Sequence, residues 1–149
     1  MPKWSKESSD KLHTCDTRLI KLFDKVIESI DCKIIYGHRS SSLQFELYKQ
    51  GRENINGKWI VVDKKRIVTN CDGINTKSMH NYYPSLAIDV IPYPVDWEDM
   101  NRFYHYIGFV RGIATMMKIN ITSGIDWNSN FDLKDQNFFD YPHFQVAEK

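Results

Sequence analysis

Three residues of this sequence could together hold a metal ion. Asp89 interrupts an apolar run, residues 86–91, that has the length and composition of a buried strand. A buried carboxylate is strongly destabilising unless it has a partner, which can be a metal ion, an arginine or a set of backbone N–H groups. His80 lies nine residues upstream and His143 lies near the C-terminus. Two imidazoles and one carboxylate are a common catalytic zinc set that leaves the fourth position for water.

A second carboxylate, Asp140, stands three residues before His143. In an extended segment, residues at positions i and i+3 face opposite ways, but Pro142 implies a bend that can bring both side chains to one site. A carboxylate there could take a proton from a zinc-activated water and pass it to a leaving amine. Each fragment alone is weak, because a lone histidine is usually a surface or packed residue and Asp-x-Pro-His alone could be a turn.

Composition limits the organisation and the partners of the protein. The 149 residues contain no repeat, linker or low-complexity tract, so we expect one domain over residues 1–149 without a separate binding module. With 20 Lys and Arg against 19 Asp and Glu, the charge indicates no nucleic-acid partner. The sequence shows no signal peptide and no stretch long enough to span a membrane, so we expect no stable membrane association. We also expect a monomer. Cys15, Cys32 and Cys71 are too few for a disulfide framework and are interpreted as reduced thiols.

Periodicity and turn residues indicate which elements must position these groups. Strands and helices do not alternate as in a parallel sheet, so the fold class is α+β, with a small, largely antiparallel sheet packed with helices. The predicted helices cover residues 16–30, 41–50 and, with Asp96 as N-cap, 97–117; the predicted strands cover 32–36, 86–91, 121–123 and 143–146, with a hairpin between 58–62 and 66–69.

Ordered motifs along nearly the whole chain resemble a known group of enzymes, the zinc peptidases of the D-alanyl-D-alanine carboxypeptidase group. The likeness is most specific to phage endolysins that act as L-alanyl-D-glutamate peptidases. The matching motifs are Gly37-His38-Arg39-Ser40, Gln44, Leu47-Tyr48, Gly51-Arg52, Val68-Thr69, Asp72-Gly73, Ser78-x-His80-Asn81, Pro84-Ser85-x-Ala87-x-Asp89-Val90, Pro92-Tyr93-Pro94-x-Asp96-Trp97, Gly124-x-Asp126-Trp127 and Asp140-x-Pro142-His143-Phe144.

The resemblance implies a role for each candidate residue. His80, Asp89 and His143 would be the zinc ligands, in a groove over the sheet, and Asp140 would be the general base. Arg39 would stabilise the oxyanion, a task that suits a guanidinium held in place before the reaction. The implied substrate is the peptidoglycan stem peptide, cut between L-Ala and D-Glu. The resemblance also implies an enzyme made in the host cytoplasm that reaches the wall after the membrane is permeabilised, with no separate wall-binding module.

One departure from the family pattern and two alternative functions complete the sequence interpretation. Before Gly124 the family usually carries an Arg-Trp-Gly-type run, whereas this chain has Ile121-Thr122-Ser123, which predicts altered substrate affinity or specificity. A D-Ala-D-Ala carboxypeptidase could use the same zinc site. A non-catalytic zinc-bearing wall-binding module, similar to the hedgehog signalling domains of this fold, is the other alternative. Retention of Asp140 argues against the binding module, because a structural site needs no base.

Overall fold

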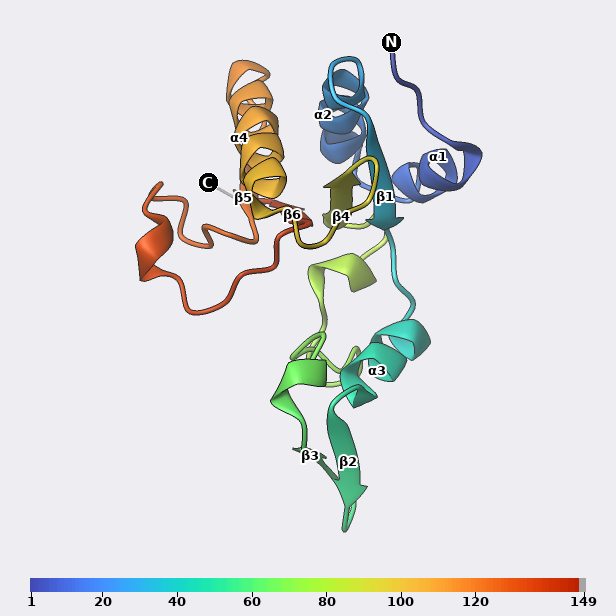
Figure 1. The fold of residues 1–149 in the computed structure, drawn as a ribbon. Coiled ribbons are helices and arrows are strands. Elements are labelled where there is room, and N and C mark those ends of the chain that lie inside the picture. The colour runs from blue at the N-terminus through green and yellow to red at the C-terminus, as the bar shows by residue number, and fades with distance from the viewer. Residues whose placement is uncertain (148–149) are drawn as a thin grey trace.

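The computed structural model describes residues 1–147, and it has the predicted α+β class with a four-stranded antiparallel sheet (Figure 1). The helices are α1 (Lys6–Leu12), α2 (Thr17–Ile27), α3 (Ser41–Lys49) and α4 (Met100–Met116), with short 3₁₀ helices η1 (Lys64–Arg66), η2 (Met79–Asn81) and η3 (Leu133–Asp135). The strands are β1 (Cys32–Tyr36), β2 (Arg52–Ile55), β3 (Lys58–Val61), β4 (Ala87–Pro92), β5 (Ile121–Ser123) and β6 (His143–Val146).

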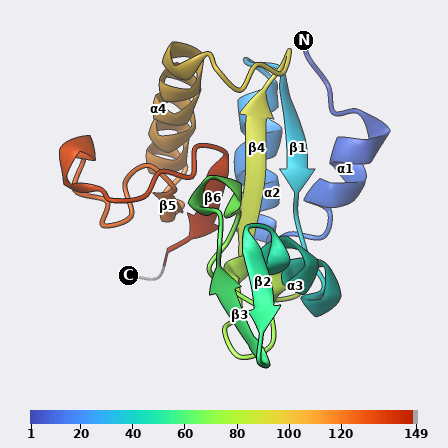
Figure 2. The same ribbon diagram turned by 60° about the horizontal axis from the view of Figure 1, so that its bottom comes forward.

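The main sheet has the order β1-β4-β6-β5, so that β6 lies between β4 and β5. Helices α2 and α4 pack against one face of this sheet (Figures 1 and 2). The core between them is made of the apolar stripes of both helices and the inward-facing residues of the strands, among them Phe23, Phe103, Ile88 and Phe144. Because successive strand residues point to opposite faces, Asp89 and His143 lie on the face away from these helices.

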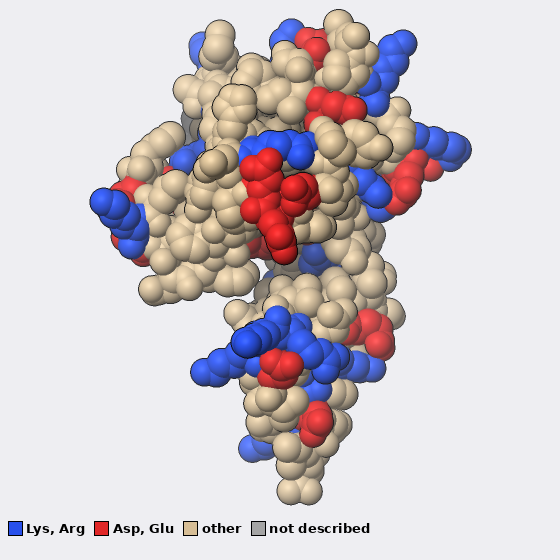
Figure 3. Space-filling view, in the orientation of Figure 1, with Lys and Arg blue, Asp and Glu red and all other residues tan. Residues whose placement is uncertain are grey.

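A smaller lobe, formed by residues 40–78, extends from the end of β1 and carries α3, η1 and the β2–β3 hairpin (Figure 2). Lys and Arg side chains gather on it around η1, which contributes Lys64, Lys65 and Arg66 (Figure 3). The near-neutral total charge is therefore unevenly distributed over the molecule.

The hairpin of this lobe differs from the prediction. Residues 66–69 form no strand, and β3 pairs instead with β2 through a two-residue turn at Asn56 and Gly57. Both turn residues have positive φ, 54° and 83°, which suits the Asn-Gly turn that most strongly favours a hairpin. The predicted pairing overlooked this dipeptide.

Two helix boundaries also differ from the prediction. α2, predicted over residues 16–30, has Asp16 as its N-cap and ends at Ile27, three residues early. α4 begins at Met100, because Asp99 accepts a hydrogen bond from the backbone N–H of Arg102 and so caps the helix in place of Asp96. Trp97 consequently lies outside the helix and is 51% exposed.

Helix α1, which packs beside β1, was not predicted from the sequence. Within residues 1–147, no helix is both long and apolar enough to cross a membrane.

Candidate active site

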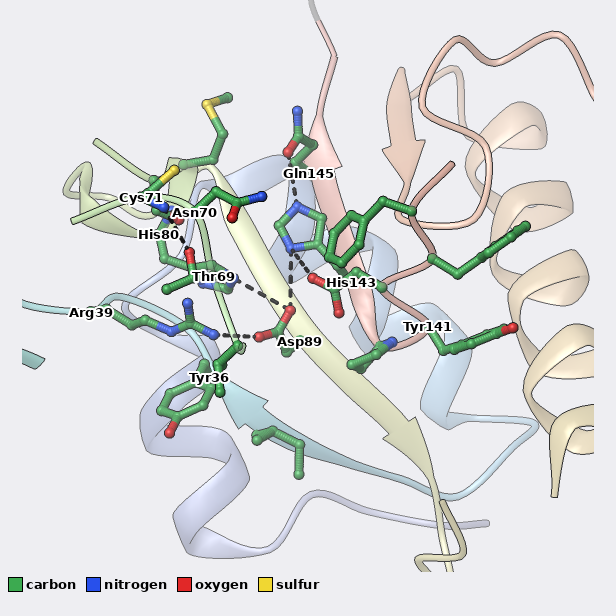
Figure 4. A pocket seen from close by; sticks show the side chains of 18 of the residues that line it. Tyr36, Arg39, Thr69, Asn70, Cys71, His80, Asp89, Tyr141, His143 and Gln145 are labelled. Carbon is green, nitrogen blue, oxygen red and sulfur yellow. Dashed lines mark hydrogen bonds and ion pairs between the residues drawn. The ribbon is translucent and has the colours of Figure 1, made fainter. Parts of the chain in front are cut away.

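His80, Asp89 and His143 come together on the open face of the sheet (Figure 4). Asp89 and His143 are register partners on β4 and β6, and His80 comes from η2. Oδ1 of Asp89 lies 3.3 Å from Nε2 of His80 and 3.3 Å from Nδ1 of His143. One donor atom from each residue lies within 4.8 Å of the other two, and all three residues are buried.

Each imidazole is oriented by a hydrogen bond from its other nitrogen. Nδ1 of His80 donates to the carbonyl oxygen of Gly37 at 2.8 Å, which leaves Nε2 directed at Asp89. Nε2 of His143 donates to Oε1 of Gln145 at 2.8 Å, which leaves Nδ1 directed at Asp89. This is how metal-binding histidines are usually held, with the second nitrogen fixing the tautomer and the ring orientation. The sequence interpretation missed Gly37 and Gln145 as supporting residues.

The donor set fits a divalent cation. Nε2 of His80 and Oδ1 of Asp89 are buried and have no hydrogen-bond partner within residues 1–147, an arrangement that is costly for polar groups. A cation between the three donors would satisfy both atoms. Two imidazole nitrogens and one carboxylate oxygen are the donors that zinc takes in catalytic sites. The residues present therefore suit zinc.

The electrostatics of this cluster favour an ionised Asp89 beside a neutral His80. For His143, burial lowers the pKa, but the hydrogen bond and charge of Asp89 outweigh it and raise that pKa. Burial alone would raise the pKa of Asp89, but the two neighbouring histidines outweigh it and hold that pKa well below its ordinary value. Burial lowers the pKa of His80, which favours the neutral imidazole. A neutral imidazole and an ionised carboxylate are the forms that bind a metal.

Asp140 lies beside His143, with Oδ2 3.8 Å from Nδ1 of that histidine, and its side chain is 34% exposed toward the groove. The bend predicted from Pro142 is present as a turn in which the His143 N–H donates to the Asp140 carbonyl oxygen at 3.1 Å. Burial, followed by the negative charge of Asp89, raises the pKa of Asp140 to about 6. The carboxylate faces the same space as the three metal donors without being one of them.

Gly124 holds this turn in place. Its carbonyl oxygen accepts the Asp140 N–H and its own N–H donates to the His143 carbonyl oxygen, both at 2.8 Å. A Cβ at position 124 would collide with the backbone carbonyl of Asp140. Only glycine allows this close approach, so Gly124 positions both Asp140 and His143.

Arg39 is buried, 7% exposed, and its Nη2 donates to Oδ2 of Asp89 at 2.8 Å. Its guanidinium also lies 4.2 Å from the centre of the Tyr36 ring. The sequence left open whether Asp89 is compensated by a metal or by an arginine. In the structure, Oδ2 of Asp89 accepts a hydrogen bond from Arg39, and Oδ1 faces the two histidines.

The five candidate residues line one groove. Its lining includes polar residues of the smaller lobe, such as Thr69, Asn70 and Lys77, and aromatic residues, such as Trp127 and Tyr141. Figure 4 shows Thr69 and Asn70 on the opposite side of Asp89 from Tyr141. The Trp127 ring packs against the His143 ring, with centroids 5.3 Å apart, so a residue of the family motif Gly124-x-Asp126-Trp127 borders the site.

Residues 121–123, where the sequence departs from the family pattern, lie outside the groove. These residues form β5, at the edge of the sheet beside β6, and none of the three is among the groove-lining residues in the described part of the chain. The structure thus gives no direct contact through which this departure would alter substrate binding.

Fold and site together define a class of protein, an α+β domain whose groove holds a buried His-Asp-His set that could hold a metal ion. The family profile of phage L-alanyl-D-glutamate peptidases matches residues 1–147, and the chain belongs to this family. It is therefore a peptidoglycan-cleaving L-Ala-D-Glu peptidase, as the sequence predicted.

A solved structure supports the fold. The L-Ala D-Glu endopeptidase ChiX of Serratia marcescens superposes with a TM-score of 0.64 at 19% identity, covering 97% of this chain and 89% of that chain. At this identity the likeness concerns the fold alone. Among curated protein sequences, none shows significant similarity to this chain.

Proposed function

We propose that this peptidase is zinc-dependent, with His80, Asp89 and His143 as the protein ligands. The observation that carries the proposal is that two buried atoms 3.3 Å apart, Nε2 of His80 and Oδ1 of Asp89, have no hydrogen-bond partner within residues 1–147. Zinc, when bound, would lower the pKa of a water molecule and polarise the scissile carbonyl. Gly37 and Gln145 would hold the two imidazoles in the ligating orientation.

Asp140 is the proposed general base. Its carboxylate lies 3.8 Å from Nδ1 of His143, and it is neither a member of the donor set nor in the ion pair that Arg39 forms with Asp89. It would accept the proton of the attacking water at Oδ2 and deliver it to the amine of D-Glu as the peptide bond breaks. The turn held by Gly124 supports this role, because it keeps the carboxylate at the edge of the site.

Arg39 has two proposed tasks. Its Nη2 holds Oδ2 of Asp89, which leaves Oδ1 for the metal. The same guanidinium borders the groove, where its fixed positive charge would stabilise the oxyanion that develops on the L-Ala carbonyl. A preorganised cation suits this task, since it needs no reorganisation during the reaction.

The remaining proposals concern the setting of the reaction. The enzyme would act as a monomer. It would be made in the host cytoplasm and reach the stem peptides after the membrane is permeabilised. The near-neutral total charge supports the absence of a nucleic-acid partner.

Muropeptide digestion followed by mass analysis tests the reaction and its metal together. A product with a new N-terminal D-Glu, formed by zinc-loaded protein and absent after chelation, is the expected result. Release of D-Ala would assign the protein to the carboxypeptidase alternative. Cleavage that continues after complete removal of metal would refute the zinc proposal.

A further inference from the structure

Gln44, on α3, is a fully buried polar side chain, 0% exposed, that lies behind Arg39. Its Oε1 accepts a hydrogen bond from Nη1 of Arg39 at 3.3 Å. Its Nε2 donates to Oγ1 of Thr69 at 3.1 Å and to the carbonyl oxygen of Cys71 at 3.0 Å. Both ends of the amide are therefore used, as a buried polar group requires.

The two ends of this amide reach different parts of the site. The oxygen end accepts a hydrogen bond from Arg39, and Arg39 in turn donates to Asp89 of the His-Asp-His set. The nitrogen end contacts Thr69 and Cys71, in the polar side of the groove that the smaller lobe supplies; Figure 4 shows Thr69 and Arg39 on the same side of Asp89. An amide can accept at one end and donate at the other, whereas a carboxylate only accepts and an ammonium group only donates.

The position of Gln44 is itself fixed by packing. Gly73, with φ of +79°, passes so close that a Cβ there would lie 2.8 Å from Cβ of Gln44. Ser40 caps the helix that carries Gln44 through a bond from the Leu43 N–H. The stem of Gln44 is therefore confined, and its amide is presented to Arg39 and to the groove wall in one orientation.

We propose that Gln44 is the positioning residue that joins the metal-binding set to the substrate groove. Its oxygen keeps the Arg39 guanidinium directed at Asp89, and its nitrogen holds the wall at residues 69–71 at a set distance from the metal donors. The inference rests on the proposed function for the identity of what fills the groove and the metal site. Its two halves are separable, because each depends on a different end of one amide.

Two substitutions separate the halves. Gln44→Met keeps the Cβ and Cγ that pack against Gly73 but removes both polar ends. Gln44→Glu keeps an acceptor for Arg39 and removes the donor, and it places a carboxylate against the Cys71 carbonyl oxygen. Leu47→Ala is the matched control, since Leu47 is a buried residue of the same helix that does not line the groove.

Three measurements are made on each full-length variant. They are zinc release to a chromogenic chelator, KM and kcat on a muropeptide, and the melting temperature. For Gln44→Met we expect zinc release to be about 10-fold faster, the lower end of the range for losing a residue that supports a metal ligand. We also expect a raised KM and a lowered kcat. For Gln44→Glu we expect wild-type zinc release with KM raised about 10-fold, because the contact with Arg39 is kept while the groove wall is displaced.

The result that overturns the proposal is wild-type behaviour of both Gln44 variants, or changes reproduced by Leu47→Ala at an equal loss of melting temperature. If Gln44→Met does not fold, Gln44→Glu alone tests the proposal. A raised KM with unchanged zinc release would support it, and an unchanged KM would refute it. Absence of cleavage by the zinc-loaded wild type would refute the proposed function instead, and zinc release would still test the Arg39 half.

Discussion

Asp89 and His143 are directly opposite each other on neighbouring antiparallel strands, and their side chains meet at 3.3 Å between Oδ1 and Nδ1. The hydrogen bonding of β4 with β6 therefore sets the separation of two metal donors. A register slip of one residue would turn either side chain to the opposite face of the sheet. The geometry of the site therefore depends on correct pairing of β4 with β6.

The first prediction concerns metal content. Purified protein should carry about one zinc ion per chain by elemental analysis, and His80→Ala or His143→Ala should lose both zinc and activity, because each removes one of three protein ligands. His105→Ala is the control, since His105 is exposed on α4. Wild-type zinc content in both ligand variants would contradict the assignment.

The second prediction separates the two carboxylates. Asp140→Asn should keep its zinc while turnover of a muropeptide falls by about 10² to 10⁴-fold, because an amide cannot accept the proton. Asp89→Asn should bind zinc more weakly, since a neutral ligand replaces an anionic one beside a divalent cation. Zinc loss from the Asp140 variant, with zinc and activity retained by the Asp89 variant, would show that the two roles are reversed.

The third prediction concerns Arg39. Arg39→Met should lower kcat by about 10²-fold, the loss typical of removing one oxyanion donor. Because Oδ2 of Asp89 also loses its partner, zinc should be released faster to a chelator than from the wild type. Arg66→Met, at an exposed residue of η1, is the control. An unchanged kcat would contradict the role of Arg39 in stabilising the oxyanion. Unchanged zinc release would contradict its role in orienting Asp89.

The fourth prediction compares two glycines. Gly124→Ala should destabilise the protein by about 1–3 kcal/mol, the usual cost of overpacking, because the new methyl group meets the Asp140 carbonyl. Gly112→Ala is the matched control, since a Cβ there meets nothing within 4 Å among residues 1–147. At that helical position alanine should stabilise by about 0.5–1 kcal/mol. Chemical denaturation measures both, and equal effects at the two positions would refute the close approach at Gly124.

Sequence reasoning performed best where a pattern is local. The helix over α2 and the lone carboxylate in β4 are both visible within a few neighbouring residues. The α4 boundary was missed because Asp96 and Asp99 are both acceptable caps, and only the folded chain shows that Asp99 bonds the Arg102 N–H.

The supporting contacts of the site were not predictable from spacing. Arg39 and Asp89 are 50 residues apart in sequence, and Gly37 meets His80 across 43 residues. Nothing in the local sequence of either partner encodes such a pairing, since it depends on how β1, β4 and η2 assemble. The resemblance to a family supplied Arg39 as a candidate, but its bond to Asp89 emerged only from the fold.

The position of β6 has a consequence for when activity can arise. This strand is the last of the sheet to be synthesised, yet it occupies an interior place between β4 and β5 and supplies His143. A nascent chain that has not yet released residues 143–146 from the ribosome has neither a closed sheet nor a complete metal-binding set. Cleavage that depends on His143 therefore cannot begin before this last strand has been released and has paired with β4 and β5.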